Sequence, residues 1–234
     1  MPASRTRPAG EISRGYVLAY VYLFGYREKV LTPSADHGGP SLSAERALVE
    51  RAQRGETDAF GALYDLYLPR VYRYCLGRVG MAVDAEDLAE EVFLKAFRSI
   101  NKFKWRLNKK SERSPFGSWL FRIAHNDVVS FYRQTARRPA ASELTDDIRD
   151  RTRGPVEIAE QRFAVEEAFQ AVRELPPAQR DVILLRFSAG LSVAETAEAL
   201  GKQENNVKVL QHKGIKQLRN MLTSVPGRTI ESPR

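Results

Sequence analysis

Two charge clusters of opposite sign follow one another in the middle of this chain. Residues 84–91 hold five carboxylates and no basic residue, whereas residues 95–113 hold eight Lys or Arg residues and one Glu. Lys and Arg bind nucleic-acid phosphates and aromatic rings stack on unpaired bases, so the basic segment and the aromatic residues after it favour a single strand as partner. The carboxylates repel the same polyanion. The pattern therefore favours two partners for neighbouring surfaces, DNA and a large protein. The alternatives are that the carboxylates only cap and solvate a helix start, which explains them well when they are taken alone, and that the aromatic residues belong to a core.

A third candidate site lies near the C-terminus, where two predicted helices, residues 193–200 and 204–222, are separated by Gly201. This spacing is typical of a helix-turn-helix, and Ser192 with Glu195 forms a capping-box pattern before the first helix. Asn and His can contact base edges, and Lys can contact phosphates. The residues expected on the outer face of the second helix are Asn205, Asn206, Lys208, Val209, His212, Lys213 and Lys216. The alternative is an ordinary helical hairpin with a solvated basic face.

No set of residues in the sequence has the spacing of a catalytic or metal site. The three histidines, His37, His125 and His212, lie in unrelated segments, and no nucleophile is paired with a base. The single cysteine, Cys75, excludes an internal disulfide and is expected to be a buried thiol. We therefore expect no enzymatic activity, no cofactor and no metal.

The overall charge supports a polyanionic partner. The 234 residues carry a formal net charge of +8, and 43% of them are hydrophobic, which is enough for ordinary globular cores. A basic protein without such a partner is the alternative. The apolar run at residues 16–26 spans 11 residues, whereas a membrane-spanning helix needs about 20. We expect no membrane insertion and a cytoplasmic protein.

Helical periodicity predicts an all-α protein of two small helical bundles joined by a flexible linker, the C-terminal bundle containing the helix-turn-helix. The expected segments are an N-terminal extension at residues 1–45, a four-helix bundle at 46–138, a linker at 139–156, a second bundle at 157–224 and a tail at 225–234. Residues 1–45 fit neither bundle.

Capping residues predict where the helices of the first bundle begin. Thr57 and Asp84 are candidate N-caps for its second and third helices, and Ser114 followed by Pro115 is a candidate start for the fourth. Pro69 is expected to kink or split the second helix. We expect Trp105 to be exposed. The buried stripe expected on the third helix consists of Leu88, Val92, Phe93, Ala96 and Phe97.

These motifs resemble those of bacterial RNA polymerase sigma factors. Residues 84–97 (DAEDLAEEVFLKAF) resemble their acidic helix, and residues 116–126 (FGSWLFRIAHN) resemble the helix that melts the promoter and contacts the −10 element. Residues 175–187 (LPPAQRDVILLRF) and 190–201 (GLSVAETAEALG) resemble the domain that binds the −35 element. With only these two domains and a short linker, the chain is similar to the extracytoplasmic-function type over roughly residues 45–222.

The resemblance implies a role for each motif. Asp87, Glu90 and Glu91 would bind the coiled-coil clamp helices of the polymerase β′ subunit, and the apolar surface at residues 184–187 would meet the β flap. The last helix would enter the −35 major groove through the outer residues named above. Such factors are commonly held inactive by an anti-sigma factor. Flipped −10 bases would be captured by the loop 103–115 and the helix after it, through Lys104, Trp105, Arg106, Trp119, Arg122, Asn126 and Arg133.

The sequence departs from the family pattern at several positions. The loop between Phe103 and Phe116 is longer, Ser130 replaces a common Asp, Gln203 replaces a small N-cap, and Gln211 replaces a common Leu. The rival hypothesis is a stand-alone helix-turn-helix regulator that binds duplex DNA without polymerase. A nucleic-acid enzyme is a third class, disfavoured by the missing catalytic set.

Overall fold

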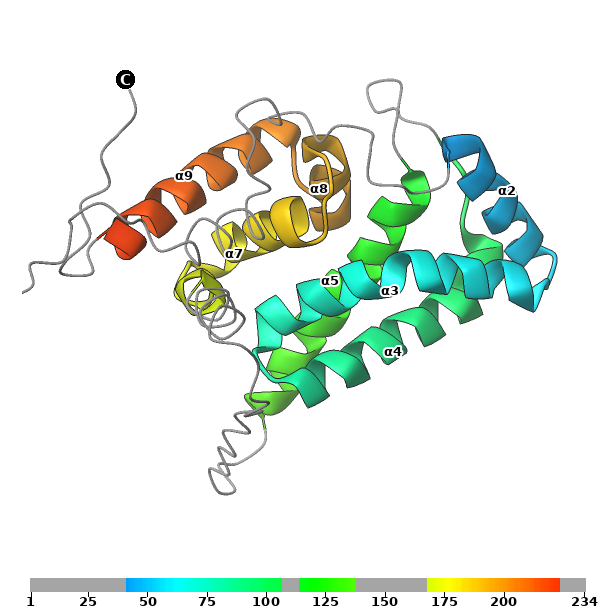
Figure 1. Ribbon diagram of the computed structural model, residues 1–234, viewed down its shortest axis with the longest axis horizontal. Helices are drawn as coiled ribbons and strands as arrows, with labels where there is room; N and C mark the ends of the chain where they lie inside the picture. The colour runs from blue at the N-terminus through cyan, green and yellow to red at the C-terminus, as the bar shows by residue number, and fades with distance from the viewer. Residues whose placement is uncertain (1–40, 107–113, 138–167, 224–234) are drawn as a thin grey trace, which may run out of the picture.

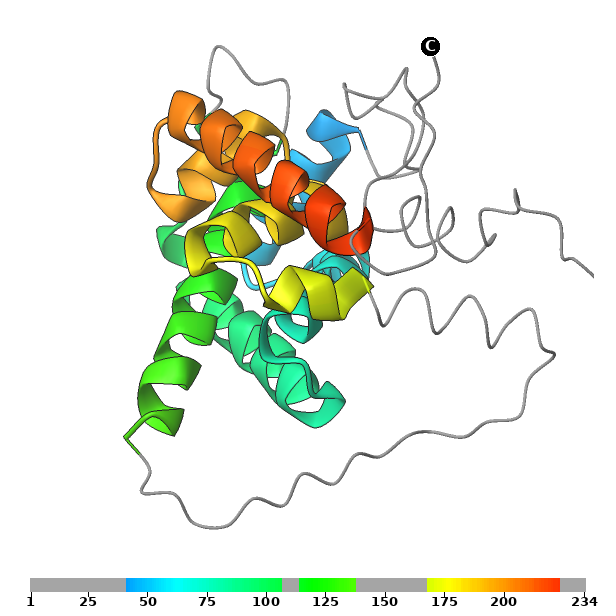
Figure 2. The ribbon, with the colours of Figure 1, turned by 90° about the vertical axis from the view of Figure 1, so that its left-hand side faces the viewer.

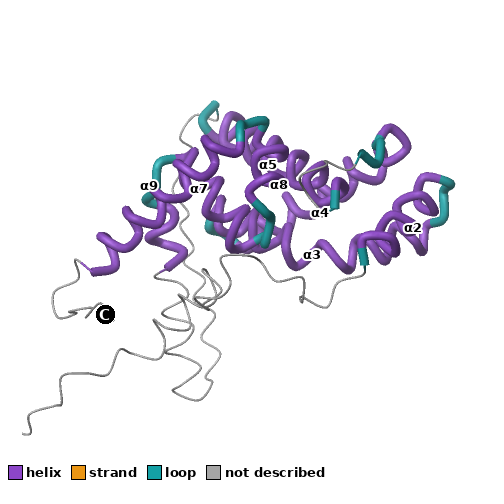
Figure 3. Tube along the Cα trace, turned by 90° about the horizontal axis from the view of Figure 1, so that it is seen from above, coloured by secondary structure: helices purple, strands orange, loops and turns teal. Residues whose placement is uncertain are grey.

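The computed structural model describes residues 41–106, 114–137 and 168–223. These ranges contain helices and connecting turns and no strand (Figure 3), which confirms the predicted all-α class. Most of the predicted extension 1–45, the predicted linker 139–156 and the predicted tail 225–234 lie outside the described residues. The helix predicted from residue 157 is described from residue 168 onward.

Four α-helices of the described residues form the N-terminal unit, as the periodicity predicted. They are α2 (Leu42–Gln53), α3 (Thr57–Val79), α4 (Ala82–Ser99) and α5 (Pro115–Thr135), with the 3-10 turn η1 (Ile100–Lys102) after α4. Helix α3 is central, because α2, α4 and α5 all pack against it (Figure 1). Its inward face buries Tyr67, Tyr74 and Cys75, so the prediction of a buried thiol is confirmed.

Helix starts agree with the capping prediction at α5 and differ from it at α3 and α4, and α2 begins earlier than predicted. The Ser114 hydroxyl accepts from the Gly117 amide at 3.1 Å, with Pro115 in the first turn. Helix α2 begins within the predicted extension, because Ser41 accepts from the Ala44 amide at 3.2 Å and so caps it. Thr57 is the first residue of α3 and not its cap.

The prediction that Asp84 caps its helix is wrong, and Pro69 does not split the helix that contains it. Helix α4 has Met81 as its N-cap, because Gly80 adopts the left-handed conformation that ends α3 and the chain re-enters a helix immediately. Asp84 lies in the first turn, where its charge still suits the positive helix end. Helix α3 continues through Pro69 without a break.

The C-terminal unit contains the predicted helix-turn-helix. Residues 168–173 are helical and precede α7 (Pro177–Ile183), the π-helical turn η2 (Leu184–Ser188), α8 (Val193–Leu200) and α9 (Glu204–Thr223). Helix α9 packs against α7 and α8 and lies on the outer side of the unit (Figure 2). Gly214 permits the close approach of α9 to α7, because a Cβ there would lie 2.9 Å from Cγ1 of Ile183.

The two units pack directly against each other. Helix α5 contacts α8, and α3 contacts η2. Most of the buried apolar residues form one continuous cluster that includes Tyr74 and Phe121 from the N-terminal unit and Leu184 and Leu185 from the C-terminal unit. A smaller cluster of Val182, Ala197 and Val207 lies within the C-terminal unit. The sequence predicted two bundles, and the structure shows that they share a core.

Candidate nucleic-acid interface

Helix α8 begins with a capping box and ends at a glycine turn that leads into α9. The Ser192 hydroxyl accepts from the Glu195 amide at 3.1 Å, and the Ser192 amide donates to the Glu195 carboxylate at 2.7 Å. This is the predicted capping box. Gly201 ends α8 with a φ of 62°, a conformation that glycine adopts without strain. The turn therefore presents the first residues of α9 to solvent.

The outer face of α9 carries the predicted −35 residues. Asn205, Asn206, Lys208, Val209, His212 and Lys213 are all exposed. On the opposite side Val207 and Leu218 are buried, as the periodicity predicted. Amide, imidazole and ammonium groups on one exposed helix face can contact base edges and phosphates in a major groove. An exposed apolar residue in the same face, Val209, suits a thymine methyl group.

Gln211, which departs from the family pattern, has a structural role. Its side-chain oxygen accepts a hydrogen bond from Nε of Arg186 at 2.9 Å, and Arg186 also donates to the Leu191 carbonyl. This chain of contacts ties α9 to η2 and to the segment before α8. A leucine at position 211 would leave Arg186 without this acceptor.

Two of the predicted −10 residues are partly buried. Trp105 and Trp119 both contact Phe103, at centroid distances of 6.2 and 5.1 Å. The prediction that Trp105 is exposed is therefore wrong, because the edge of its ring packs against Phe103. The basic and amide residues predicted for the same site remain exposed: Lys104, Arg106, Arg122, Asn126 and Arg133. Residues 107–113 of the predicted −10 loop lie outside the described residues.

The start of α5 is fixed by a buried carboxylate from α2. Glu45 is 5% exposed, and its Oε1 accepts hydrogen bonds from the Tyr67 hydroxyl at 2.7 Å and from Ser114. Burial raises the pKa of Glu45, although the hydrogen bonds from Ser114 and Tyr67 oppose the rise. The Tyr67 ring in turn packs edge-on against Phe116, 5.5 Å between centroids. Sequence periodicity had not indicated this contact.

The acidic face of α4 is exposed as predicted. Asp87 and Glu90 are exposed, and Glu91 is half-buried beside Lys95, whose Nζ lies 3.2 Å from Glu91 and 2.7 Å from Asp127. Phe97 does not belong to the buried stripe, because it lies on the same face as Glu90 and is 50% exposed. Its ring contacts only the edge of the bundle, at Phe60, 5.0 Å away.

Apolar residues continue the acidic face along the helix. Val83, Asp87, Glu90, Leu94 and Phe97 are all exposed and recur at spacings of four, three, four and three. This is the spacing of a seam along which one helix packs against another. Leu94 and Phe97 are functional candidates that the analysis of charges missed, although this spacing alone would have identified them.

The apolar segment predicted for the β flap is covered in this structure. Leu184 and Leu185 are fully buried, and Leu184 lies against Gly77 of α3. The expectation of an apolar surface is wrong for these two residues in this arrangement, because the N-terminal unit occupies that side. No group of His, Cys, Asp and Glu residues among the described residues is arranged to hold a metal ion.

The comparison with known proteins agrees with this geometry. Models of sigma-70 region 2 and sigma-70 region 4 match residues 63–138 and 166–218. The chain is 39% identical over 192 residues to the ECF RNA polymerase sigma factor BldN of Streptomyces coelicolor, which covers 80% of this chain and 70% of BldN. The chain belongs to the extracytoplasmic-function (ECF) sigma factors. Sigma factors of this family direct promoter-specific transcription initiation, so a stand-alone regulator is not favoured.

Other relatives support the same assignment. The ECF sigma factor SigX of Bacillus subtilis is 35% identical over 167 residues, covering 69% of this chain and 82% of SigX. Among solved structures, CnrH in complex with the cytosolic domain of CnrY aligns with a TM-score of 0.57 at 22% identity, covering 78% of this chain and 99% of CnrH. This likeness shows the shared fold. None of the helices described for this ECF factor has the length and apolarity needed to cross a bilayer.

Proposed function

We propose that this ECF sigma factor binds core RNA polymerase through α4, the −10 element through α5 and the preceding loop, and the −35 element through α9. The polymerase performs the chemistry, in the cytoplasm, and the factor supplies promoter specificity and assists strand opening. The observation that carries this proposal is the mixed acidic and apolar face of α4. This surface repels DNA and exposes Leu94 and Phe97, so it fits a protein partner.

The spacing on α4 indicates the kind of partner. An exposed seam at spacings of four and three fits a helical partner such as a coiled coil, where apolar residues pack and flanking charges set the orientation. Asp87 and Glu90 favour a basic partner surface. The clamp helices of the β′ subunit have the required helical form. Because the sigma factor RpoE of Bartonella quintana was crystallised with the anti-sigma factor NepR, we propose that an anti-sigma factor competes for surfaces of this chain.

The DNA-facing assignments rest on side-chain chemistry. Helix α9 combines Asn205 and Asn206 with exposed lysines, which suits base contacts in duplex DNA anchored by phosphate contacts. Around the start of α5, Trp119 is partly exposed among basic residues, which suits an unpaired strand. We therefore expect the −35 promoter element to be bound as duplex DNA and the −10 promoter element to be bound as a single strand.

Charge reversal on α4 tests the proposal. Glu90→Lys is preferable to a change at Glu91, because Glu90 is exposed and Glu91 is tied to Lys95. We expect Glu90→Lys to weaken binding to purified core polymerase at least tenfold and to reduce run-off transcription from the DNA upstream of its own gene. Asp65→Lys on α3 is the matched control, since Asp65 is also an exposed carboxylate and lies outside the seam. Equal polymerase affinity for the two variants would contradict the assignment of α4.

A further inference from the structure

Helix α2 contacts the chain on both sides of the segment proposed to bind the −10 strand. Gln53, the last residue of α2, donates through Nε2 to the carbonyl of Ile100 at 2.9 Å and to that of Phe103 at 2.7 Å. Glu45, about two turns earlier in the same helix, accepts from the Ser114 hydroxyl. One short helix therefore holds the chain at Phe103 and again at Ser114.

The contacts of Gln53 complete the end of α4. The carbonyls at a helix end have no partner within that helix, and Ile100 is the C-cap of α4. Ile100 and Phe103 also close the 3-10 turn η1, because the Phe103 amide donates to the Ile100 carbonyl at 3.0 Å. The side-chain amide of Gln53 has two N–H donors, and each carbonyl accepts one of them. Since a carbonyl only accepts, the nitrogen of this amide must face η1.

Phe103 connects this turn to the aromatic residues of the proposed −10 surface. Its side chain is buried, and its ring lies 5.8 Å from that of Phe116, at the start of α5. The rings of Trp105 and Trp119 lie 6.2 and 5.1 Å from the same ring. A shift of the Phe103 backbone would therefore move the tryptophans on which an unpaired base is proposed to stack.

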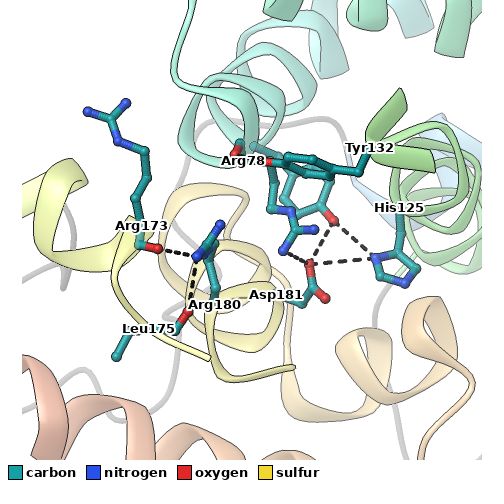
Figure 4. A network of polar contacts seen from close by, with 8 residues as sticks. Arg78, His125, Tyr132, Arg173, Leu175, Arg180 and Asp181 are labelled. Atoms are coloured by element: carbon teal, nitrogen blue, oxygen red, sulfur yellow. Dashed lines mark hydrogen bonds and ion pairs between the residues drawn. The ribbon is translucent and has the colours of Figure 1, made fainter. Parts of the chain in front are cut away.

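The contact of Glu45 fixes the start of α5 and leaves the far end of that helix to other contacts. The Ser114 hydroxyl donates to the buried Glu45 and accepts from the Gly117 amide, so it caps α5. Near the other end of α5 the Tyr132 hydroxyl donates to the Arg78 carbonyl of α3, and the Arg78 guanidinium lies over the Tyr132 ring, 5.5 Å from its centroid (Figure 4). Changes in α2 should therefore affect the start of α5 more than its end.

We propose that α2 positions the −10 surface, with Gln53 and Glu45 holding the backbone from which the base-contacting side chains project. The proposal rests on the proposed function, because it takes Trp105 and Trp119 as part of that surface. Helix α2 lies outside residues 63–138, which match sigma-70 region 2. A segment that is held before binding loses less conformational entropy when the strand binds, so the two contacts strengthen −10 binding.

The substitution Gln53→Met tests the positioning role. It removes both hydrogen bonds and keeps the charge, the approximate length and the helix propensity of the side chain. The matched control is Ala47→Met, which introduces the same residue at an exposed position of α2. Each variant is assembled with core polymerase and titrated with two probes from a promoter that run-off transcription has mapped. One probe is the single-stranded non-template −10 sequence, and the other is the −35 duplex.

The two probes should respond differently. We expect Gln53→Met to bind the −10 strand about tenfold more weakly than Ala47→Met, which is the size of effect that two lost hydrogen bonds produce. Binding to the −35 duplex should be equal for the two variants, because α9 belongs to the other unit. Equal −10 affinity for Gln53→Met and Ala47→Met would overturn the proposal.

A second pair of variants tests whether the donors of Gln53 are what matters. Gln53→Lys places an ammonium group, which has three N–H donors, within reach of the same two carbonyls. Ala47→Lys adds the same charge at an exposed position, so both variants share any added attraction to DNA. We expect the two Lys variants to bind the −10 strand equally. If Gln53→Lys is as much weaker than Ala47→Lys as Gln53→Met is than Ala47→Met, hydrogen bonding to η1 is not the cause.

The substitution Val49→Ala separates positioning from stability. Val49 is buried on α2, four residues from Glu45 and four from Gln53, and its truncation leaves a cavity without removing either contact. Urea denaturation ranks the variants by stability. We expect Val49→Ala to lower the free energy of unfolding at least as much as Gln53→Met and still to keep −10 affinity. A loss of −10 affinity that follows stability alone would overturn the positioning role.

Tryptophan emission of the free factor reports the surroundings of Phe103. The chain has two tryptophans, Trp105 and Trp119, and both rings contact Phe103. We expect Gln53→Met to shift the emission to longer wavelength, because Trp105 gains contact with water when Phe103 is released. Ala47→Met and Val49→Ala should leave the spectrum unchanged. An unchanged spectrum in Gln53→Met would show that Gln53 does not hold Phe103 in place.

Run-off transcription by the unmodified factor tests the proposed function separately. An active factor whose Gln53→Met variant binds the −10 strand as well as the control would refute only the positioning role of α2. An unmodified factor that neither binds core polymerase nor directs a defined transcript would refute the proposed function itself.

Discussion

Glu45 accepts a hydrogen bond from Ser114, the residue that caps α5 and lies 69 positions further along the chain. The contact ties the first described helix to the start of the proposed −10 helix. Because the same oxygen also accepts from Tyr67, one carboxylate organises two buried hydroxyl groups. Glu45 is therefore a positioning residue for the proposed −10 surface, although it is far from that surface in the sequence.

Removing this carboxylate should weaken both the fold and −10 binding. In Glu45→Ala the hydroxyls of Tyr67 and Ser114 lose a buried acceptor, which should cost about 1–3 kcal/mol of the free energy of unfolding. Urea denaturation checks this value. Binding of the single-stranded −10 probe should fall more than binding of the −35 duplex, since α9 lies elsewhere. Equal losses on the two probes would indicate a purely global effect on stability.

The raised pKa of Glu45 predicts a pH dependence of stability. A carboxyl group whose folded pKa lies above its unfolded value of 4.5 binds its proton more tightly in the folded state. Its contribution to stability is fully present below pH 4.5 and is lost as the pH rises through the folded pKa. Glu45→Gln cannot titrate at this position, so the stability of the unmodified protein relative to this variant should increase between pH 7.5 and 5. If the difference in free energy of unfolding between the unmodified protein and Glu45→Gln does not change with pH, the prediction that Glu45 titrates as a buried carboxyl group is contradicted.

Asn205 and Lys208 should have separable effects on −35 binding. The matched −35 duplex and a duplex changed at one base pair differ in binding free energy. Asn205→Ala should reduce this difference by about 1–3 kcal/mol, because an amide can contact adenine through two hydrogen bonds. Lys208→Ala should weaken all duplexes about equally and reduce the salt slope of log Kobs against log[salt] by about one. Titrations of matched and mutated −35 duplexes at several salt concentrations distinguish the two. If Lys208→Ala loses discrimination between matched and mutated duplexes and Asn205→Ala keeps it, then Lys208 contacts a base and the two assignments are reversed.

Cys75 should resist alkylation in the folded protein. Burial, with a smaller contribution from the charge of Asp127, raises the pKa of its thiol to about 12. Since the thiolate is the reactive form, iodoacetamide at pH 8 should modify the native protein about a thousandfold more slowly than the unfolded chain. Mass spectrometry after timed quenching measures the rate. Rapid modification of the native protein would show that the α3 core opens readily.

The sequence by itself determined the helices, the capped start of α8, the glycine turn before α9 and the outward residues of α9. These features depend on local spacing: a Ser and a Glu three residues apart cap α8, and period-3.6 polarity assigns Val207 inward and Asn205 outward. The local chemistry at Ser114 likewise identified the start of α5. The motifs also indicated the sigma family, which the comparisons confirmed.

Only the tertiary structure decided what covers each helical face. Periodicity assigned Phe97 to the core, whereas Phe97 lies on the exposed face of α4. Trp105 was expected in solvent, whereas Phe103 covers part of it. The hydrogen bond from the Tyr74 hydroxyl to Asp181 joins residues 107 positions apart, one from each unit. Helical spacing specifies which side chains share a face of one helix, but the partner of that face depends on how whole helices pack, and this packing is absent from any local pattern.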